Sequence, residues 1–122
     1  MLEPLGRGLQ QGVEARLAFR HSIYGSQVEE HFRVAENGFE LVRLRYAEER
    51  LVEFYGHESA RSENGWWVVD GDRRRFSSLV VRGSPESRIS LSVGRRSVSL
   101  SRLMEAGGVR VAPATCEGDN GR

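Results

Sequence analysis

Three side chains capable of acid–base chemistry, His21, Glu30 and His57, are the first candidates for a functional site in this sequence. His21 and Glu30 both lie in the strand-like run FRHSIYGSQVEEHFRV, residues 19–34. A carboxylate beside an imidazole orients the ring and raises its basicity, which suits a proton relay or a ligand contact. With His57, the pair would also complete a two-histidine, one-carboxylate set of the kind that binds zinc or non-haem iron.

A β-hairpin would position the first two of these side chains. Alternating apolar residues predict strands over 17–23 and 28–34, joined by a two-residue turn at Gly25-Ser26. In that register His21 lies directly opposite Glu30 on the apolar face, with Cβ atoms about 4.5–5.5 Å apart. Two interpretations follow: the pair is functional, or it is a buried structural pair in which each group satisfies the other.

Two other chemistries are less well supported by the spacing. Ser22 points away from the face that carries His21, so these neighbours cannot form a nucleophile–base pair within one strand. A zinc site needs three or four ligands, and His57 comes from a loop with no histidine spacing that favours a metal. We therefore expect no bound metal and no cofactor.

Aromatic and arginine side chains form a second group of candidates. Two tryptophans adjacent on a strand face opposite ways, so one is expected in the core. The other either lies under a loop or, with Tyr55 or Arg61 nearby, forms a stacking platform for a sugar or peptide. The arginine run at 73–75, beside two aspartates, is either an anion or partner site or a solvated turn. The candidate ligand or partner surface comprises Tyr55, His57, Trp66, Trp67, Arg73, Arg74 and Arg75.

The rest of the chain has mostly a period of two. A turn and bulge at Gly38 would return a strand with Val42, Leu44 and Tyr46 on the core face. Residues 47–59 are ambiguous, and we predict a short strand plus irregular loop rather than a helix. Further strands are predicted in 65–71, 76–83, 88–94, 97–103 and 109–113, with one helical turn in 101–108. This pattern predicts an all-β fold: a small antiparallel barrel or sandwich of eight or nine short strands with hairpin and meander connections.

Length and charge limit the possible functions. The 122 residues suffice for one domain, which we place at 13–113, with an N-terminal flank (1–12) and a flexible polar tail (114–122). A formal net charge of +1, with no oligonucleotide-binding motif, argues against nucleic acid and anionic membranes as partners. The single cysteine, Cys116, provides no disulfide framework. Residues 1–16 contain no apolar run typical of a secretory signal or membrane span.

Several segments together resemble one bacterial family. They are HSIYGSQVEEHFRV, FELVRLRY, FYGHES, GWWVV and the closing GGVRVAP, and over 13–113 they resemble the domain of unknown function family DUF1850. The resemblance implies genes beside TAXI-type TRAP transporters, which import small carboxylates, and therefore transporter subunits or a small carboxylate as partners. It also implies an N-terminal anchor: the protein is expected to be extracytoplasmic if such a segment was trimmed, and cytoplasmic otherwise.

Three functional hypotheses remain open at this point. The first is a non-enzymatic binding or accessory domain, associated with TRAP-type transport. The second is a small enzyme or metal-dependent hydrolase that uses His21, Glu30 and His57. The third is a purely structural interaction domain. A concave pocket that contains His21 with an open face would distinguish the second hypothesis from the first, because an enzyme has no site here if the core seals off the His21–Glu30 pair.

Overall fold

Ten antiparallel strands and one short helix make up the described part of the chain. The computed structural model describes residues 13–35, 37–82, 88–100 and 108–112. The elements are β1 (Glu14–Arg20), β2 (Gln27–Ala35), β3 (Gly38–Tyr46), α1 (Glu49–Phe54), β4 (Arg61–Glu63), β5 (Trp66–Asp70), β6 (Arg75–Phe76), β7 (Leu79–Arg82), β8 (Ser90–Val93), β9 (Arg96–Ser99) and β10 (Gly108–Val111). The prediction of an all-β fold is confirmed.

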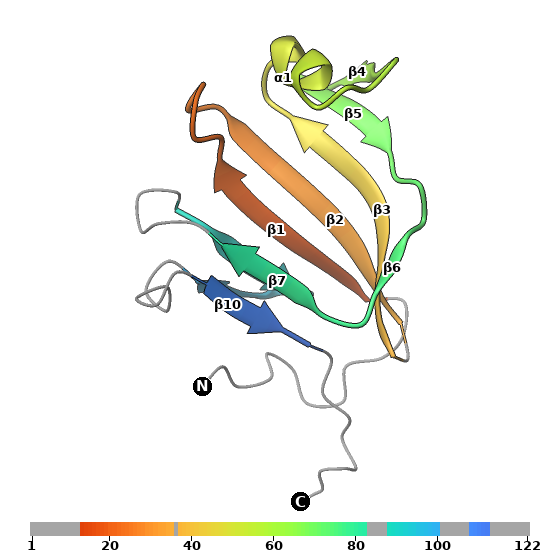
Figure 1. Ribbon diagram of the computed structural model, residues 1–122, viewed down its shortest axis with the longest axis vertical. Coiled ribbons are helices and arrows are strands. Elements are labelled where there is room, and N and C mark those ends of the chain that lie inside the picture. The colour runs from red at the N-terminus through yellow and green to blue at the C-terminus, as the bar shows by residue number, and fades with distance from the viewer. Residues whose placement is uncertain (1–12, 36, 83–87, 101–107, 113–122) are drawn as a thin grey trace, which may run out of the picture.

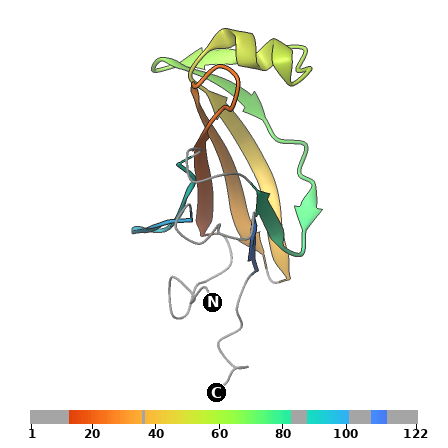
Figure 2. The same ribbon diagram turned by 60° about the vertical axis from the view of Figure 1, so that its left-hand side comes forward.

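The strands form two sheets. The larger has the order β4-β5-β3-β2-β1-β8-β9, with β6 also paired to β3, and the smaller pairs β7 with β10 (Figure 1). The described strands do not close into a barrel, so the sandwich alternative holds. We call the face of the larger sheet that is turned toward β7 and β10 its inner face, and the opposite side its outer face (Figure 2).

Two apolar clusters lie on the inner face. The first joins the sheets, because Phe32 and Leu41 of the larger sheet pack with Leu79 and Val81 of β7 and Val111 of β10. The second lies toward the end of the sheet where α1 sits, and is formed by Val28, Tyr46, Leu51 and Val52. The clusters together anchor both the small sheet and the helix to the inner face.

The first hairpin exists, but the register predicted for it was wrong. Leu17 lies opposite Glu30, and Phe19 lies opposite Val28. Relative to the prediction, the strands are displaced by four residues. An even displacement keeps every side chain on its expected face, so Glu30 still points inward. The predicted pairing of His21 with Glu30 does not occur.

The reason is a longer loop than a Gly-Ser turn. β1 ends at Arg20, and residues 21–26 connect it to β2. His21 N donates to the carbonyl of Ser26, and Gly25 N donates to the carbonyl of His21, both at 2.8 Å. Gly25 has φ of +71°, the left-handed conformation that favours glycine. His21 thus closes the loop instead of continuing the strand.

A β-bulge in β3 changes which residues face inward. Phe32 pairs with Leu41 and its neighbour His31 pairs with Arg43, so Val42 is the extra residue. The prediction for the residues after this point was correct, since Leu44 and Tyr46 face the inner side. The bulge therefore lies at Val42 and not at Gly38. Glycine is needed at position 38 for a different reason, because a Cβ there would lie 2.1 Å from the carbonyl oxygen of Phe76.

The segment 47–59 is where the prediction of secondary structure failed. Its residues Glu49–Phe54 form helix α1, with Glu49 in the first turn, and not a strand, while residues 57–59 form a loop as predicted. One helical turn brings Leu51 and Tyr55 to the same side, because Tyr55 N donates to the carbonyl of Leu51 at 3.1 Å. Burial of the adjacent Leu51 and Val52 against β2 and β3 stabilises this turn.

The other predicted strands are present as β5, β7, β8, β9 and β10, and the hairpin about Gly94-Arg95 joins β8 to β9. The helical turn predicted for 101–108 falls almost wholly outside the described residues. No helix in the described ranges is long and apolar enough to cross a membrane.

Candidate functional site

Two adjoining cavities hollow the inner face of the larger sheet. Their volumes are about 580 and about 510 Å³. Leu17, Glu30, Tyr55 and Val80 line both, and we refer to the two together as the inner cavity. β7 contributes Val80 from the small sheet, while the end of α1 contributes Tyr55. The inner cavity therefore lies where both sheets and the helix meet.

Glu30 is the acidic side chain that lines both parts of the inner cavity, which Arg20 and Arg74 also border. Its neighbours across the strands are Leu17 on β1 and Leu44 on β3, so its side chain lies among apolar residues. Among the residues that the structure describes, none forms a hydrogen bond or ion pair with the Glu30 carboxylate. Burial raises the pKa of this carboxyl, and the positive charge of Arg74 only partly opposes the change.

Tyr46, Tyr55 and His57 form an aromatic group beside Glu30. The Tyr46 hydroxyl lies 2.8 Å from Nε2 of His57, and the rings of Tyr46 and Tyr55 stack with centroids 5.4 Å apart. Burial is the main cause of a raised pKa at both tyrosines, and the charge of Glu30 raises both further. Both phenols are therefore neutral, and they lie within electrostatic reach of Glu30.

His21 belongs to the wall of the inner cavity, in the part also lined by Phe54. Its Nδ1 accepts hydrogen bonds from the backbone amides of Ile23 at 3.3 Å and Tyr24 at 3.2 Å. The ring also meets the ring of Phe54 edge-on at 4.6 Å. Since Nδ1 is already used by the loop, His21 positions the rim of the cavity and is poorly suited to relay protons from Glu30.

The arginine run is divided among different surroundings. Arg74 lines the inner cavity, but its Nε binds Asp72 at 2.7 Å and its guanidinium lies 5.6 Å from the ring centre of Phe76. Arg73 pairs with Glu40 at 3.2 Å, and Arg75 is exposed in β6. Only Arg74 of the three belongs to the site.

The two tryptophans face opposite sides of β5, as predicted. Trp67 packs against the cluster of Tyr46 on the inner side. Trp66 is covered on the other side by the guanidinium of Arg45, 4.3 Å from its ring centre. Trp66 lies with Arg45 on the outer side, whereas Tyr55 lines the inner cavity, so the two rings do not face one surface.

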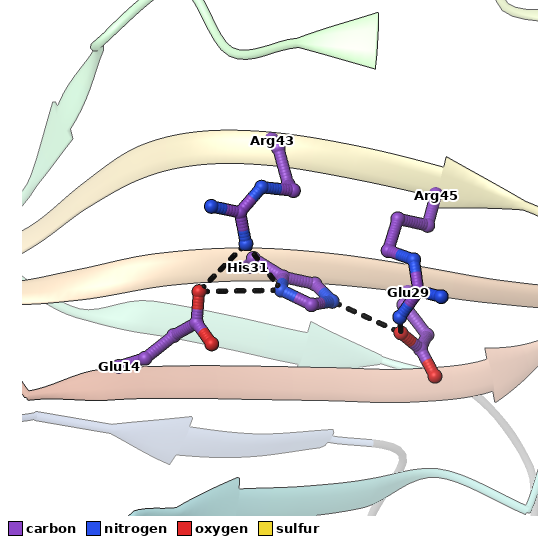
Figure 3. A network of polar contacts seen from close by, with 5 residues as sticks. All are labelled: Glu14, Glu29, His31, Arg43 and Arg45. Carbon is purple, nitrogen blue, oxygen red and sulfur yellow. Dashed lines mark hydrogen bonds and ion pairs between the residues drawn. The ribbon is translucent and has the colours of Figure 1, made fainter. Parts of the chain in front are cut away.

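The outer face carries a polar network that the sequence analysis missed. His31 is only 4% exposed, and its Nδ1 lies 3.0 Å from a guanidinium nitrogen of Arg43 and 3.3 Å from Glu14 (Figure 3). Its Nε2 lies 2.9 Å from Glu29, which also accepts a hydrogen bond from Arg45 at 2.8 Å. The sequence contained the information needed to predict this network, because strand alternation places its residues together on the face opposite Glu30.

The proposed metal ligands do not come together. His21 and His57 line different parts of the inner cavity, and only Glu30 of the three lines both. Within the described ranges there is no group of three or more histidine, cysteine, aspartate or glutamate side chains that could hold a metal ion.

The part of the chain that builds this site resembles a known protein family. A family model described as Domain of unknown function (DUF1850) matches residues 15–100. The chain belongs to the DUF1850 family. The part that matches DUF1850 runs from β1 to β9 and includes every residue named above as lining the inner cavity. No curated protein and no solved structure matches the chain.

Proposed function

We propose that this DUF1850 domain is a non-enzymatic binding module that holds a small molecule in the inner cavity. The observation that carries the proposal is the Glu30 carboxyl, which faces the cavity without a hydrogen-bond partner in the described residues. Burying such a group lowers the stability of the fold, and an apolar residue at this position would make the sheet more stable. Groups that conflict with their surroundings in this way are typical of functional sites.

The dimensions of the inner cavity support the same proposal. Its larger part, about 580 Å³, is within the range of about 300–1,000 Å³ typical of small-molecule sites. Its walls are largely apolar, and a few polar groups converge in it: Glu30, the Tyr55 hydroxyl, and the Tyr46–His57 pair. Apolar walls with few polar groups are the usual composition of a ligand site.

The test blocks the cavity without disturbing the core. Val80 lines both parts of the cavity but is 53% exposed, so Val80→Trp should fill the cavity and still fold. Ile23→Trp, at a residue that is 67% exposed and lines neither part, is the matched control. A thermal-shift screen of small carboxylates, amines and neutral compounds should find ligands, since saturation at 100 times Kd stabilises a fold by about 2.7 kcal/mol.

We expect these ligands to raise the melting temperature of the parent protein and of Ile23→Trp, and to have no effect on Val80→Trp. Equal shifts in all three proteins would place binding elsewhere. The absence of any ligand across the screen would also count against the proposal.

We also propose that the domain serves a TAXI-type TRAP transporter, with the transporter's binding protein or membrane subunits as partners. Family membership supports this, through the gene association that it implies. Cross-linking in cells that express the neighbouring transporter genes is the test. Links between the domain and these subunits are expected, and their absence while the subunits link to one another would contradict this role.

A small enzyme is the second candidate, and one observation favours it. The Tyr46–His57 contact of 2.8 Å lies in the same cavity as Glu30, so an acid and a base are close to any bound molecule. If this candidate is correct, NMR spectra of the screened ligands should show a product over time, and His57→Gln should stop its formation. Unchanged ligand spectra would leave binding alone as the function.

A further inference from the structure

We propose that the ligand of the inner cavity is an ammonium compound with an apolar body, and that its ammonium group binds the Glu30 carboxylate. This inference rests on the proposed function, because it assigns a chemical class to the ligand of that cavity. Neither the sequence patterns nor the family membership indicates a cation. The inference comes from the charges and rings around Glu30.

Glu30 is the one acidic side chain among the described residues that line the inner cavity, and neither arginine that borders the cavity, Arg20 or Arg74, forms a hydrogen bond or ion pair with it. Arg20 is exposed at the end of β1. The other acidic groups within its electrostatic reach, Tyr46 and Tyr55, offer only neutral phenols. Arg74 acts on Glu30 from the cavity wall, but its guanidinium is bonded to Asp72. A ligand carboxylate would add a second negative charge close to Glu30, whereas an ammonium group would neutralise the first.

The aromatic lining also suits a cation. The ring of Tyr46 lines one part of the cavity, those of His21 and Phe54 line the other, and Tyr55 lines both. Aromatic faces within about 6 Å attract ammonium groups, more strongly where water is excluded. Leu17, Phe32 and Val80 supply apolar walls for the rest of the ligand. A carboxylate combined with aromatic rings is thus present without any rearrangement of the fold.

The protonation behaviour of Glu30 agrees with this chemistry. Burial raises its pKa, because the positive charge of Arg74 compensates only partly for the lost water. A bound ammonium group would supply that charge and favour the ionised carboxylate. Ligand and carboxylate would then form a charge-assisted hydrogen bond of the strong kind.

Three probes of similar shape separate the possible charges: phenethylammonium, 2-phenylethanol and 3-phenylpropionate. Their affinities are measured by NMR titration at neutral pH on the intact chain. We expect phenethylammonium to bind about tenfold more tightly than 2-phenylethanol, the gain expected from one hydrogen bond to a charged group. The carboxylate probe should bind most weakly.

Variants at two glutamates complete the design. Glu30→Gln should lower the affinity for phenethylammonium about tenfold and leave 2-phenylethanol almost unaffected, because only the charged contact is lost. Glu53→Gln is the control, since Glu53 is an exposed carboxylate on α1 that does not line the cavity. It should change neither affinity. Melting curves of both variants establish that they are folded.

The outcomes distinguish this inference from the proposed function. If 2-phenylethanol or 3-phenylpropionate binds as tightly as the amine, or if Glu30→Gln leaves amine binding intact, the ammonium assignment is wrong and the cavity remains a ligand site. If the three probes fail but screened carboxylates or neutral compounds bind and are blocked by Val80→Trp, the ammonium assignment is wrong and the proposed function stands. If no compound of any charge binds, both proposals fail.

Discussion

Glu29 and Glu30 are neighbours in β2, yet they lie in opposite electrostatic environments. On the outer face, Glu29 is within hydrogen-bond distance of His31 and Arg45, and those contacts lower its pKa despite partial burial. On the inner face, Glu30 lies in an apolar cavity, where burial raises its pKa. Strand alternation alone sends the two carboxylates to different sides.

The difference shows that burial of a polar group does not by itself identify a functional site. His31 is more deeply buried than any other polar group of the outer network, and each of its ring nitrogens lies within hydrogen-bond distance of a neighbouring side chain. Such a network is complete, and it is best explained as part of the fold. Glu30 has no such partner in the described residues, and this absence distinguishes the inner site.

The largest effect should come from breaking the outer network at its centre. His31→Leu removes the group between Glu14 and Glu29 and leaves Glu29 with fewer partners, so we expect the free energy of unfolding to fall by about 1–3 kcal/mol in urea melts. Glu14→Gln is the comparison, because its side chain is 47% exposed and should cost about 0–1 kcal/mol. Equal losses in the two variants would show that the network has no buried centre.

An effect of opposite sign is expected on the inner face. Glu30→Gln replaces a buried charge with a neutral amide, which costs less to bury, so at pH 8 the free energy of unfolding should rise by about 1 kcal/mol. Glu29→Gln should lower it, because Arg45 and His31 lose a charged partner. A loss of stability in Glu30→Gln would mean that the carboxylate has a stabilising partner in the fold.

The two glutamates should also give opposite pH dependences. The pKa of Glu30 is raised in the folded state, so its contribution is fully present below the ordinary value of 4.5 and is lost as pH rises through the folded pKa. The pKa of Glu29 is lowered, so its contribution is present above 4.5 and is lost as pH falls through the folded pKa.

Urea melts of the parent and both glutamine variants across this range are the measurement. The advantage of Glu30→Gln should disappear in acid, and so should the deficit of Glu29→Gln. Parallel curves for the two variants would contradict the assignment of the two environments.

The smallest effect should come from an exposed ion pair. Arg61 lies 3.0 Å from Asp70, and both side chains are well exposed. Arg61→Ala should therefore leave the urea midpoint unchanged within error, because solvent screens such a pair. A clear loss would mean that pairing stabilises this protein even without burial, and would weaken the contrast drawn at Glu29.

Much of the fold could be predicted from local patterns. The period of two placed Glu30, Leu44 and Tyr46 on the inner side, and the turn residues located the β8–β9 hairpin. The register of the first hairpin could not be found in this way. A displacement of four residues preserves every face, so the hydrophobic pattern fits both registers equally well. Only the hydrogen bonds of His21 within the loop decide between them.

The candidate site was predictable in its residues but not in its shape. Glu30, Tyr55, His57 and Arg74 were candidates, and the fold brings them to one cavity. That cavity depends on a small sheet held to the larger one by tertiary packing, and no periodicity within a segment reveals such packing. The helix was missed for a similar reason, because its stability comes from burial against β2 and β3 and not from the propensity of residues 49–54.

The pairing of β7 with β10 also has a consequence for folding kinetics. β1, β2 and β3 are joined by short connections. Val111 of β10, in contrast, pairs with Leu79 of β7, which is far away in the sequence. Closing this longer loop has a greater entropic cost than forming the β1–β2–β3 hairpins. We therefore expect the meander to form before the transition state and the small sheet after it, so that Glu30 stays hydrated until the last step. In a chevron plot, Glu30→Gln should then slow unfolding and leave the refolding rate nearly unchanged.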